Sequence, residues 1–298
     1  MNLFTIRLLV VCLGLVAPAV LAQPPLGPAG AEGAPDREQP WLVPTPDAAT
    51  PAHAMLFRPP GEGPFRLALI AHATTQNVLR RAQMPQPEYR PLAAYLVARG
   101  FAVLVPERLG HGATGGPYLE DQGGCDEADY ARAGRATAEQ IAVALKFALA
   151  QPFIRNDGAV IIGHSGGGWG ALALAGEDTK GIAAIIAFAP GRGGHANDME
   201  NRVCAPHTLL AAAGEFGRAA RVPVTWLVAA NDTYFSPDLS RRLADAFRAA
   251  GGKLDFRMLG ASGSEGHWLA ETESGVMLAD GALDSALRLG QPAAAKKR

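Results

Sequence analysis

The sequence predicts an α/β fold, with a mostly parallel central sheet and helices on both of its faces. Two observations lead to this class. Short apolar runs alternate along the chain with longer segments of helical spacing, as in parallel sheets whose strands are connected by helices. The runs are nearly continuous in apolar residues, which is typical of strands buried on both faces. The 298-residue sequence has no internal repeat, so we expect one domain over residues 51–298.

The predicted elements follow in a regular order. The apolar runs are too short for helices and are bounded by polar or glycine-rich segments, so we expect strands at residues 67–73, 101–107, 158–164, 182–190, 222–230 and 253–260. Periodic apolar residues predict helices at residues 87–100, 127–151, 166–175, 207–220, 236–252 and 275–290. The long connection between the fourth and fifth of these strands, about residues 191–221, is expected to form a small cap insertion over a pocket.

The N-terminus has the features of a secretory signal peptide. Arg7 precedes an apolar run over residues 8–16, and Val20-Leu21-Ala22 matches a signal-peptidase site. We expect cleavage after residue 22 and export to the periplasm or beyond, with residues 23–50 as a flexible, Pro-, Ala- and Gly-rich lead-in. The apolar run is short for a membrane span, so stable insertion is not expected after cleavage. An uncleaved anchor is the alternative.

Charge and cysteine content narrow the possibilities further. The formal net charge of −1 gives no reason to expect nucleic acid as a partner. Cleavage would remove Cys12 and leave Cys125 and Cys204. Two remaining cysteines in an exported protein more often pair than stay free, so we expect a Cys125–Cys204 disulfide that closes a long loop. Two separate small core residues are the alternative.

The segment "GHSGG" after the third predicted strand carries the main chemical signal. Gly163-x-Ser165-x-Gly167 matches the nucleophile elbow, in which a serine occupies a strained turn between a strand and a helix and its neighbours must be small. The N–H of Gly166, at the start of that helix, can stabilise an oxyanion. A plain glycine-rich turn is the alternative, but the apolar strand before and the small-residue helix after favour a nucleophilic Ser165.

A nucleophilic serine needs a histidine base, and in elbow-type folds the histidine follows the serine and the acid in the chain. His267 satisfies this order, since it lies in a polar loop just after the last predicted strand. His195 also follows Ser165, but it lies within the insertion and is expected at the substrate pocket instead.

The orienting acid is expected at the end of the strand before the histidine loop. The apolar run "VPVTWLVAA" ends at Asn231-Asp232. Asp238 is the rival, but it lies in a helical first turn, where an acid is expected for the helix dipole alone. Glu265 is expected to be a solvated loop charge.

The remaining site residues follow from position. The second oxyanion donor should come from the loop after the first predicted strand, and a backbone N–H near Thr74 is the candidate. His72 is expected to brace that loop. Trp169 and Trp268 flank the predicted catalytic positions and could line the acyl or alcohol site, with core packing as an equal alternative.

Taken together, these blocks resemble the α/β-hydrolase superfamily, in particular its dienelactone-hydrolase-like and prolyl-oligopeptidase-like branches. The resemblance covers residues 55–298 and is carried by "GHSGGG", "ANDTYFS", "GHW" and "VPERLGHGATGG". In the last block Glu107 and Thr114 stand where aspartate and serine are common. His72-Ala73 departs from the His-Gly oxyanion loop of many members. Dienelactone hydrolase proper uses a cysteine where this chain has Ser165, so lactone cleavage does not carry over.

The sequence therefore predicts an exported serine hydrolase that cleaves a carboxylic ester, or a related acyl bond, of a small molecule. Water would release the acid from an acyl-enzyme. The histidines lack the spacing of metal ligands, and we expect neither metal nor cofactor. A small prolyl-oligopeptidase-like peptidase, an acyl transferase and a non-catalytic binding protein of the same fold are the alternatives.

Overall fold

The computed structural model describes residues 25–177 and 180–289. The predicted signal peptide lies outside these residues. Within them, one nine-stranded sheet has the strand order β1-β2-β3-β5-β4-β6-β7-β8-β9. The strands are β1 (Gly27–Pro28), β2 (Gln39–Val43), β3 (Ala52–Phe57), β4 (Arg66–Ala71), β5 (Phe101–Pro106), β6 (Ala159–His164), β7 (Ile182–Phe188), β8 (Val224–Ala229) and β9 (Leu254–Leu259).

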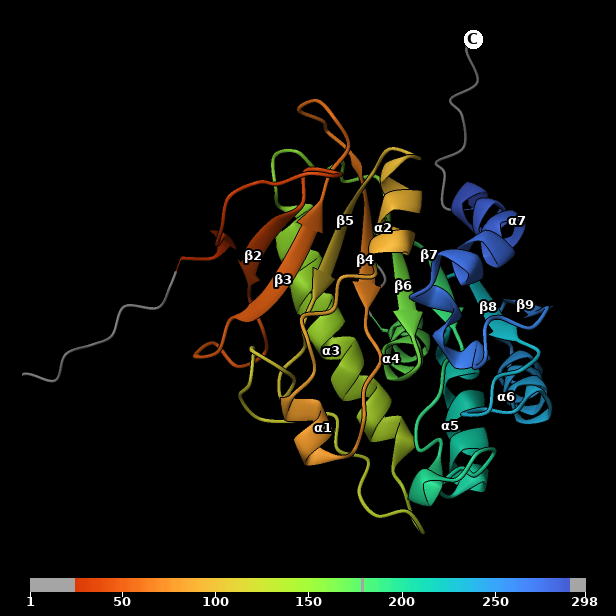
Figure 1. Ribbon diagram of the computed structural model, residues 1–298. Coiled ribbons are helices and arrows are strands. Elements are labelled where there is room, and N and C mark those ends of the chain that lie inside the picture. The colour runs from red at the N-terminus through yellow and green to blue at the C-terminus, as the bar shows by residue number, and fades with distance from the viewer. Residues whose placement is uncertain (1–24, 178–179, 290–298) are drawn as a thin grey trace, which may run out of the picture.

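The strands from β4 to β9 run parallel, and β1, β2 and β3 form an antiparallel edge beside β5. Every residue of β5, β6 and β8 is buried, as expected for strands covered on both faces. Because the strands are parallel, their carboxyl ends meet at one edge of the sheet, as the arrows of β4 to β6 show in Figure 1. Residues that directly follow these strands are thereby gathered at that edge.

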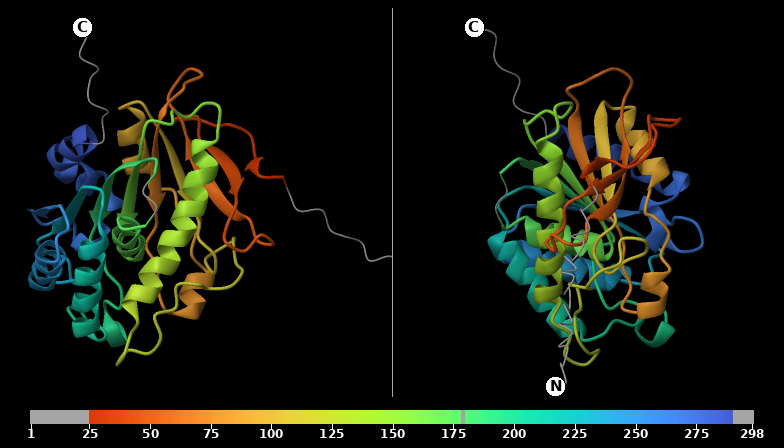
Figure 2. Two further views of the ribbon diagram at one scale, coloured as in Figure 1. Left: turned by 180° about the vertical axis from the view of Figure 1, so that it is seen from behind. Right: turned by 90° about the vertical axis from the view of Figure 1, so that its left-hand side faces the viewer.

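Helices cover both faces of the sheet, which confirms the predicted fold class. One face packs against α3 (Tyr130–Leu149), α4 (Gly166–Leu174), α5 (Pro206–Ala219) and α6 (Pro237–Ala249). The other packs against α2 (Arg90–Val97) and α7 (Glu273–Leu289). Figure 2 shows α3 crossing one face, with the sheet behind it. The short elements α1 (Val78–Ala82), η1 (Ala196–Asp198) and η2 (Gly266–Ala270) lie in connections. Within the described ranges, no helix combines the length and the apolar character needed to cross a membrane.

The predicted flexible lead-in is wrong for residues 25–50. This segment contains β1 and β2, and β2 pairs with β3 over its whole length. Trp41 and Val43 are buried in the core, where Trp41 meets the rings of Phe147 and Phe153 edge-on. The Pro- and Gly-rich composition concealed a strand whose few large apolar residues provide enough buried surface to hold it in place.

The predicted cap insertion also needs correction. Its second part forms α5, whose residues Leu209, Ala212 and Phe216 are buried in the core beside α3 and α4. Helix α5 is therefore a regular member of the helical layer. The periodic apolar residues from which it was predicted pack into the core instead of covering a pocket. Only residues 191–205 form an irregular segment at the edge where the parallel strands end.

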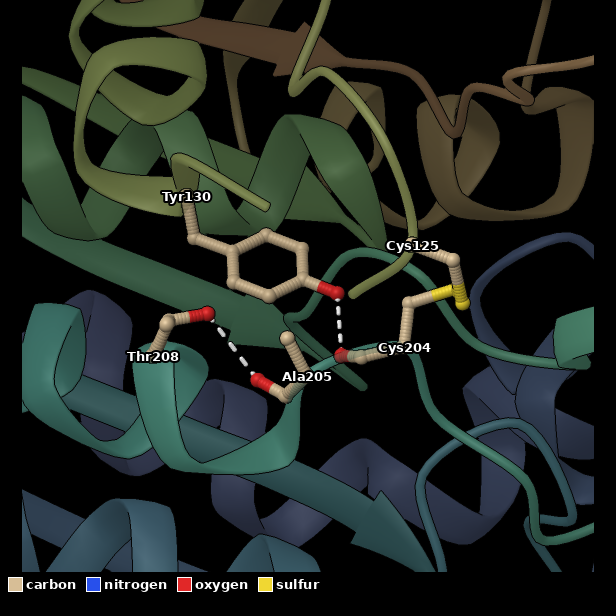
Figure 3. Close-up of a disulfide and its surroundings, with 5 residues drawn as sticks. All are labelled: Cys125, Tyr130, Cys204, Ala205 and Thr208. Carbon is tan, nitrogen blue, oxygen red and sulfur yellow. Dashed lines mark hydrogen bonds between the residues drawn. A yellow bond between two sulfur atoms is a disulfide. The ribbon is translucent and has the colours of Figure 1, made fainter. Parts of the chain in front are cut away.

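The predicted disulfide between Cys125 and Cys204 is present, and it joins positions 79 residues apart. Figure 3 shows it between the loop before α3 and the segment before α5. The hydroxyl of Tyr130 donates to the carbonyl of Cys204 at 2.5 Å, and the N–H of Cys204 donates to the carbonyl of Gly193 at 2.9 Å. The bridge therefore holds residues 191–205 against the body of the domain.

Candidate active site

Ser165 lies between β6 and α4 in a strained backbone conformation, with φ 53° and ψ −119°. The turn is tight on every side. A Cβ atom on Gly163 would lie 2.5 Å from the carbonyl oxygen of Gly167, and one on Gly167 would lie 2.1 Å from that of Ala71. Both positions therefore exclude any side chain. Such strain persists only where the surrounding structure imposes it, and it is characteristic of a nucleophile elbow.

Asp232 and His267 come together at the ends of neighbouring strands. Asp232 follows β8 and His267 lies in η2 after β9. The Nδ1–H of His267 donates to Oδ2 of Asp232 at 3.1 Å, and both side chains are buried. The other carboxylate oxygen accepts the backbone N–H groups of Tyr234 and Phe235 at 2.8 and 2.9 Å. Asp232 is thus fixed by the backbone and in turn orients the imidazole.

The imidazole of His267 is suited to accept a proton. Burial lowers its pKa below the usual 6.5, against the opposing influence of Asp232. The ring is therefore neutral at pH 7, with the proton on Nδ1 and a lone pair on Nε2. His164, the residue before Ser165, contacts the same loop, since its Nε2–H donates to the carbonyl of His267 at 2.8 Å. The structure therefore joins the serine turn directly to the histidine loop.

Glu265 is a structural residue of the histidine loop, and its prediction as a solvated charge is wrong. Its carboxylate accepts the backbone N–H of His267 at 2.9 Å and that of Thr233 at 3.1 Å. It also accepts the hydroxyl of Thr233. Glu265 thereby caps η2 and ties it to the turn that carries Asp232. In the sequence, Glu265 is a glutamate two residues before His267 in a polar loop. Nothing there distinguishes a capping glutamate from an ordinary solvated one.

Tyr234 forms a stack with two histidines that was not predicted from the sequence. Its ring is parallel to that of His267 on one face and to that of His195 on the other, with centroids 4.2 and 3.6 Å apart. Nε2 of His195 lies 2.9 Å from the hydroxyl of Thr233. His195 therefore lies near the candidate site and links residues 191–205 to the candidate base. Trp268 is 37% exposed and packs edge-on against Tyr234.

Trp169 is not a pocket residue. Its side chain is fully buried, its indole N–H donates to the carbonyl of Tyr130 at 2.9 Å, and its ring packs against Phe216 of α5. It therefore connects α3, α4 and α5 in the core. A position four residues after the nucleophile lies one helical turn below it, on the side that faces the neighbouring helices rather than the site.

The two predicted oxyanion donors adjoin each other. A Cβ atom on Gly166 would lie 2.4 Å from Cγ2 of Thr74, so the start of α4 meets the loop after β4 at this point. The N–H of the preceding residue, Ala73, donates to the hydroxyl of Tyr89 at 3.1 Å and is thereby occupied. Nε2 of His111 accepts the hydroxyl of Thr74 at 2.6 Å, which fixes this side chain. Because the N–H of Ala73 is occupied, the backbone N–H of Thr74 remains the candidate for the second oxyanion donor.

His72 braces the loop after β4, as the sequence predicted. Its Nδ1–H donates to the carbonyl of Ala73 at 2.6 Å and its Nε2 accepts the backbone N–H of Arg108 at 3.0 Å. Burial is the main reason that the pKa of His72 lies well below the usual value, and the positive charge of Arg108 lowers this pKa further. In the ranges that the structure describes, no group of three or more His, Cys, Asp or Glu side chains is arranged to hold a metal ion.

Comparison with known proteins agrees with this fold. Residues 87–191 match the model of the prolyl oligopeptidase family. A search of curated protein sequences finds no significant match. A presumed dienelactone hydrolase from Klebsiella pneumoniae is 16% identical, covering 86% of this chain and 99% of its own, with a TM-score of 0.56. An esterase from Pyrococcus furiosus is 13% identical, covering 88% and 96%, with a TM-score of 0.58.

The acylaminoacyl peptidase from Pyrococcus horikoshii is 11% identical with a TM-score of 0.58, and the match covers 88% of this chain. This chain spans only 43% of that peptidase, in contrast to its nearly full coverage of the two smaller proteins. The predicted resemblance is thereby confirmed: the chain has the α/β-hydrolase fold and is similar to dienelactone-hydrolase-like proteins, esterases and peptidases built on it, with residues 87–191 matching the prolyl oligopeptidase family.

Proposed function

We propose that this chain is a serine hydrolase that cleaves a carboxylic ester through Ser165, His267 and Asp232. The observation that carries the proposal is the hydrogen bond from the imidazole of His267 to the buried carboxylate of Asp232. It lies at the sheet edge where Ser165 occupies a strained turn. A serine, a neutral imidazole and a fixed carboxylate in this chain order are the parts that nucleophilic acyl transfer requires.

In the proposed mechanism, Nε2 of His267 takes the proton of the Ser165 hydroxyl as its oxygen attacks the ester carbonyl. Asp232 stabilises the imidazolium that forms. The tetrahedral oxyanion would accept the N–H groups of Gly166 and Thr74, each worth about 3–4 kcal/mol of barrier in comparable sites. The imidazolium then protonates the leaving alcohol. Water, deprotonated by the same histidine, attacks the acyl-enzyme, and collapse of the second oxyanion releases the acid and restores Ser165.

An ester is favoured over a peptide bond by the extent of the structural matches. The esterase and the presumed dienelactone hydrolase match over nearly their whole length, whereas the peptidase is more than twice as long as the matched region. The prolyl oligopeptidase match over residues 87–191 keeps a small peptidase as the second candidate. Export is supported by the disulfide, because such bonds persist in oxidising compartments.

The test is hydrolysis of p-nitrophenyl esters of increasing acyl length by the mature protein. Ester turnover that is lost in Ser165→Ala would support the proposal. Ser236, an N-cap residue of α6, offers a matched control: Ser236→Ala should lower stability by about 1 kcal/mol and leave turnover unchanged. Cleavage of aminoacyl anilides without cleavage of esters would favour the peptidase. Equal turnover by the wild type and Ser165→Ala would refute the proposal.

A further inference from the structure

We propose that Arg192 is part of the hydrolytic site, as a buried positive charge that stabilises the oxyanion from behind Gly166. The assignment rests on the proposed hydrolase function and adds a residue that no motif in the sequence marks. Arg192 lies in the irregular segment after β7, and its side chain is 1% exposed. Three hydrogen bonds described below fix the guanidinium, together with a fourth to the hydroxyl of Tyr118 at 3.4 Å.

Arg192 belongs to a buried cluster of two guanidiniums and one carboxylate. Glu120 accepts hydrogen bonds from both Arg108 and Arg192, and the three side chains are at most 2% exposed. The guanidinium of Arg192 also donates to the hydroxyl of Thr137 at 2.9 Å and to the carbonyl of Glu120 at 3.1 Å. The amide of Gln140 donates to Glu120 at 3.0 Å. Both carboxylate oxygens of Glu120 therefore accept hydrogen bonds from two donors each.

The cluster carries a net charge of +1. Burial opposes ionisation of Glu120, but the neighbouring Arg108 and Arg192 hold its pKa below the usual range, so it is anionic. Two cations and one anion therefore remain. Burial lowers the pKa of His111 to about 4, so this neighbouring ring adds no charge at pH 7. Nε of Arg192 has no hydrogen-bond partner among the described residues, so the charge is not fully matched by its surroundings.

This charge adjoins the predicted oxyanion site. Nη2 of Arg192 lies 3.6 Å from the position that a Cβ atom on Gly166 would take, on the same side as Thr74. The N–H of Gly191 donates to the backbone carbonyl of Ser165 at 3.2 Å. This hydrogen bond holds the backbone just before Arg192 against the backbone of the candidate nucleophile. A fixed charge in a buried site attracts a negative charge strongly because little solvent screens it.

The expected effect is confined to the transition state. The substrate carbonyl is neutral and the tetrahedral intermediate is anionic, so a nearby cation lowers the energy of the second far more than that of the first. Removing the charge should therefore lower kcat and leave KM nearly unchanged. Arg192 does not need to touch the substrate for this effect, because a Coulomb interaction extends over several ångströms in a medium of low dielectric constant.

Charge-matched variants test the inference, once ester turnover that depends on Ser165 has been established. Arg192→Met leaves the cluster neutral, and we expect kcat to fall about 10- to 100-fold with KM within about twofold. Adding Glu120→Gln to Arg192→Met restores a net charge of +1 through Arg108. This double variant should regain much of the lost kcat, whereas a merely structural role predicts no recovery. The affinity for phenylboronic acid, which forms an anionic tetrahedral adduct with a serine, should follow kcat in each variant.

Circular dichroism and thermal unfolding identify the variants that fold. If Arg192→Met does not fold, Arg192→Lys and Glu120→Gln keep the question testable, because both retain the cation beside Gly166. Each should then show kcat within about threefold of the wild type despite lower stability. The inference is overturned if folded Arg192→Met keeps the wild-type kcat, if the double variant is no faster than Arg192→Met, or if folded Arg192→Lys and Glu120→Gln both lose activity. Ester turnover that does not require Ser165 would instead refute the proposed function.

Discussion

The phenol ring of Tyr234 lies parallel to the imidazole of His267, with centroids 4.2 Å apart and planes inclined by 19°. The hydrogen bond to Asp232 fixes one atom of the imidazole, and the stacked ring restricts its tilt. His195 covers the other face of Tyr234, so the orientation of the candidate base depends on packing as well as on its acid partner.

Tyr234→Ala should therefore lower kcat by about tenfold, because small displacements of a catalytic group are costly to the rate. Tyr234→Phe keeps the ring and serves as the matched control, with kcat expected within about twofold of the wild type. Steady-state kinetics on p-nitrophenyl acetate would measure both variants. Equal kcat values for the alanine and phenylalanine variants would contradict a positioning role for the stacked ring.

The pH dependence of kcat/KM should report the titration of His267. Because burial lowers the pKa of this imidazole and only the neutral form accepts a proton, activity should persist on the acid side to an apparent pKa below about 6.5. In Asp232→Asn, which removes the interaction that raises this pKa, the residual activity should titrate at still lower pH. The rate of that variant should be about 10³- to 10⁴-fold lower. An apparent pKa above 7 in the wild type would be inconsistent with a buried, desolvated base.

Stability should decrease on mild acidification because of His72 and His111. Both are buried and their folded-state pKa values lie below the ordinary value, that of His111 at about 4. The unfolded chain therefore binds more protons than the folded protein below about pH 6.5, and stability is lost as the pH falls from there toward the folded-state pKa. Each such histidine contributes a slope of up to about 1.4 kcal/mol per pH unit.

Urea unfolding at pH 7.5, 6.0 and 5.0 measures this slope. His111→Gln removes one titrating group, so the variant should be less stable at pH 7.5, and its stability should depend less steeply on pH than that of the wild type. A wild-type stability that is constant between pH 7.5 and 5.0 would show that these histidines are not buried in the neutral form.

The Cys125–Cys204 bridge should contribute substantially to stability. For a separation of 79 residues, the chain-entropy treatment gives about 4–5 kcal/mol. The paired variant Cys125→Ser with Cys204→Ser should unfold at correspondingly lower urea concentration, and reductant should destabilise the wild type but not the variant. If reductant leaves the unfolding midpoint of the wild type unchanged, the bridge is absent from the protein in solution.

The sequence was most informative about candidate site residues that come after a predicted strand. Asp232 and His267 could be predicted to lie close together because Asp232 comes at the end of an apolar run and His267 lies in the loop after the next strand, and parallel strands bring such positions to one edge. Cys125 and Cys204 could be paired because they were the two cysteines left after the predicted signal. The helices were predictable because packing on a sheet imposes a regular apolar spacing.

The errors arose where a residue's role depends on contacts between distant segments. Trp169 follows the nucleophile closely in sequence, but the helical turn directs it toward Phe216 and the core. The strand that contains Trp41 was concealed by its Pro-rich surroundings. Arg192 and Glu265 have no motif of their own, and the block "ANDTYFS" contains Tyr234 without indicating its stacking; the contacts of Arg192 with Glu120 and of Tyr234 with His267 form only in the folded chain.

The central claim is that Ser165 is a nucleophile activated by His267. Mass spectrometry of the folded protein after reaction with a fluorophosphonate tests this most directly, because the reagent bonds covalently to an activated serine. We predict a single adduct on the peptide that contains Ser165, absent in Ser165→Ala and formed far more slowly in His267→Ala. An adduct that persists in Ser165→Ala, or ester hydrolysis by a folded protein that forms no adduct at Ser165, would contradict the account.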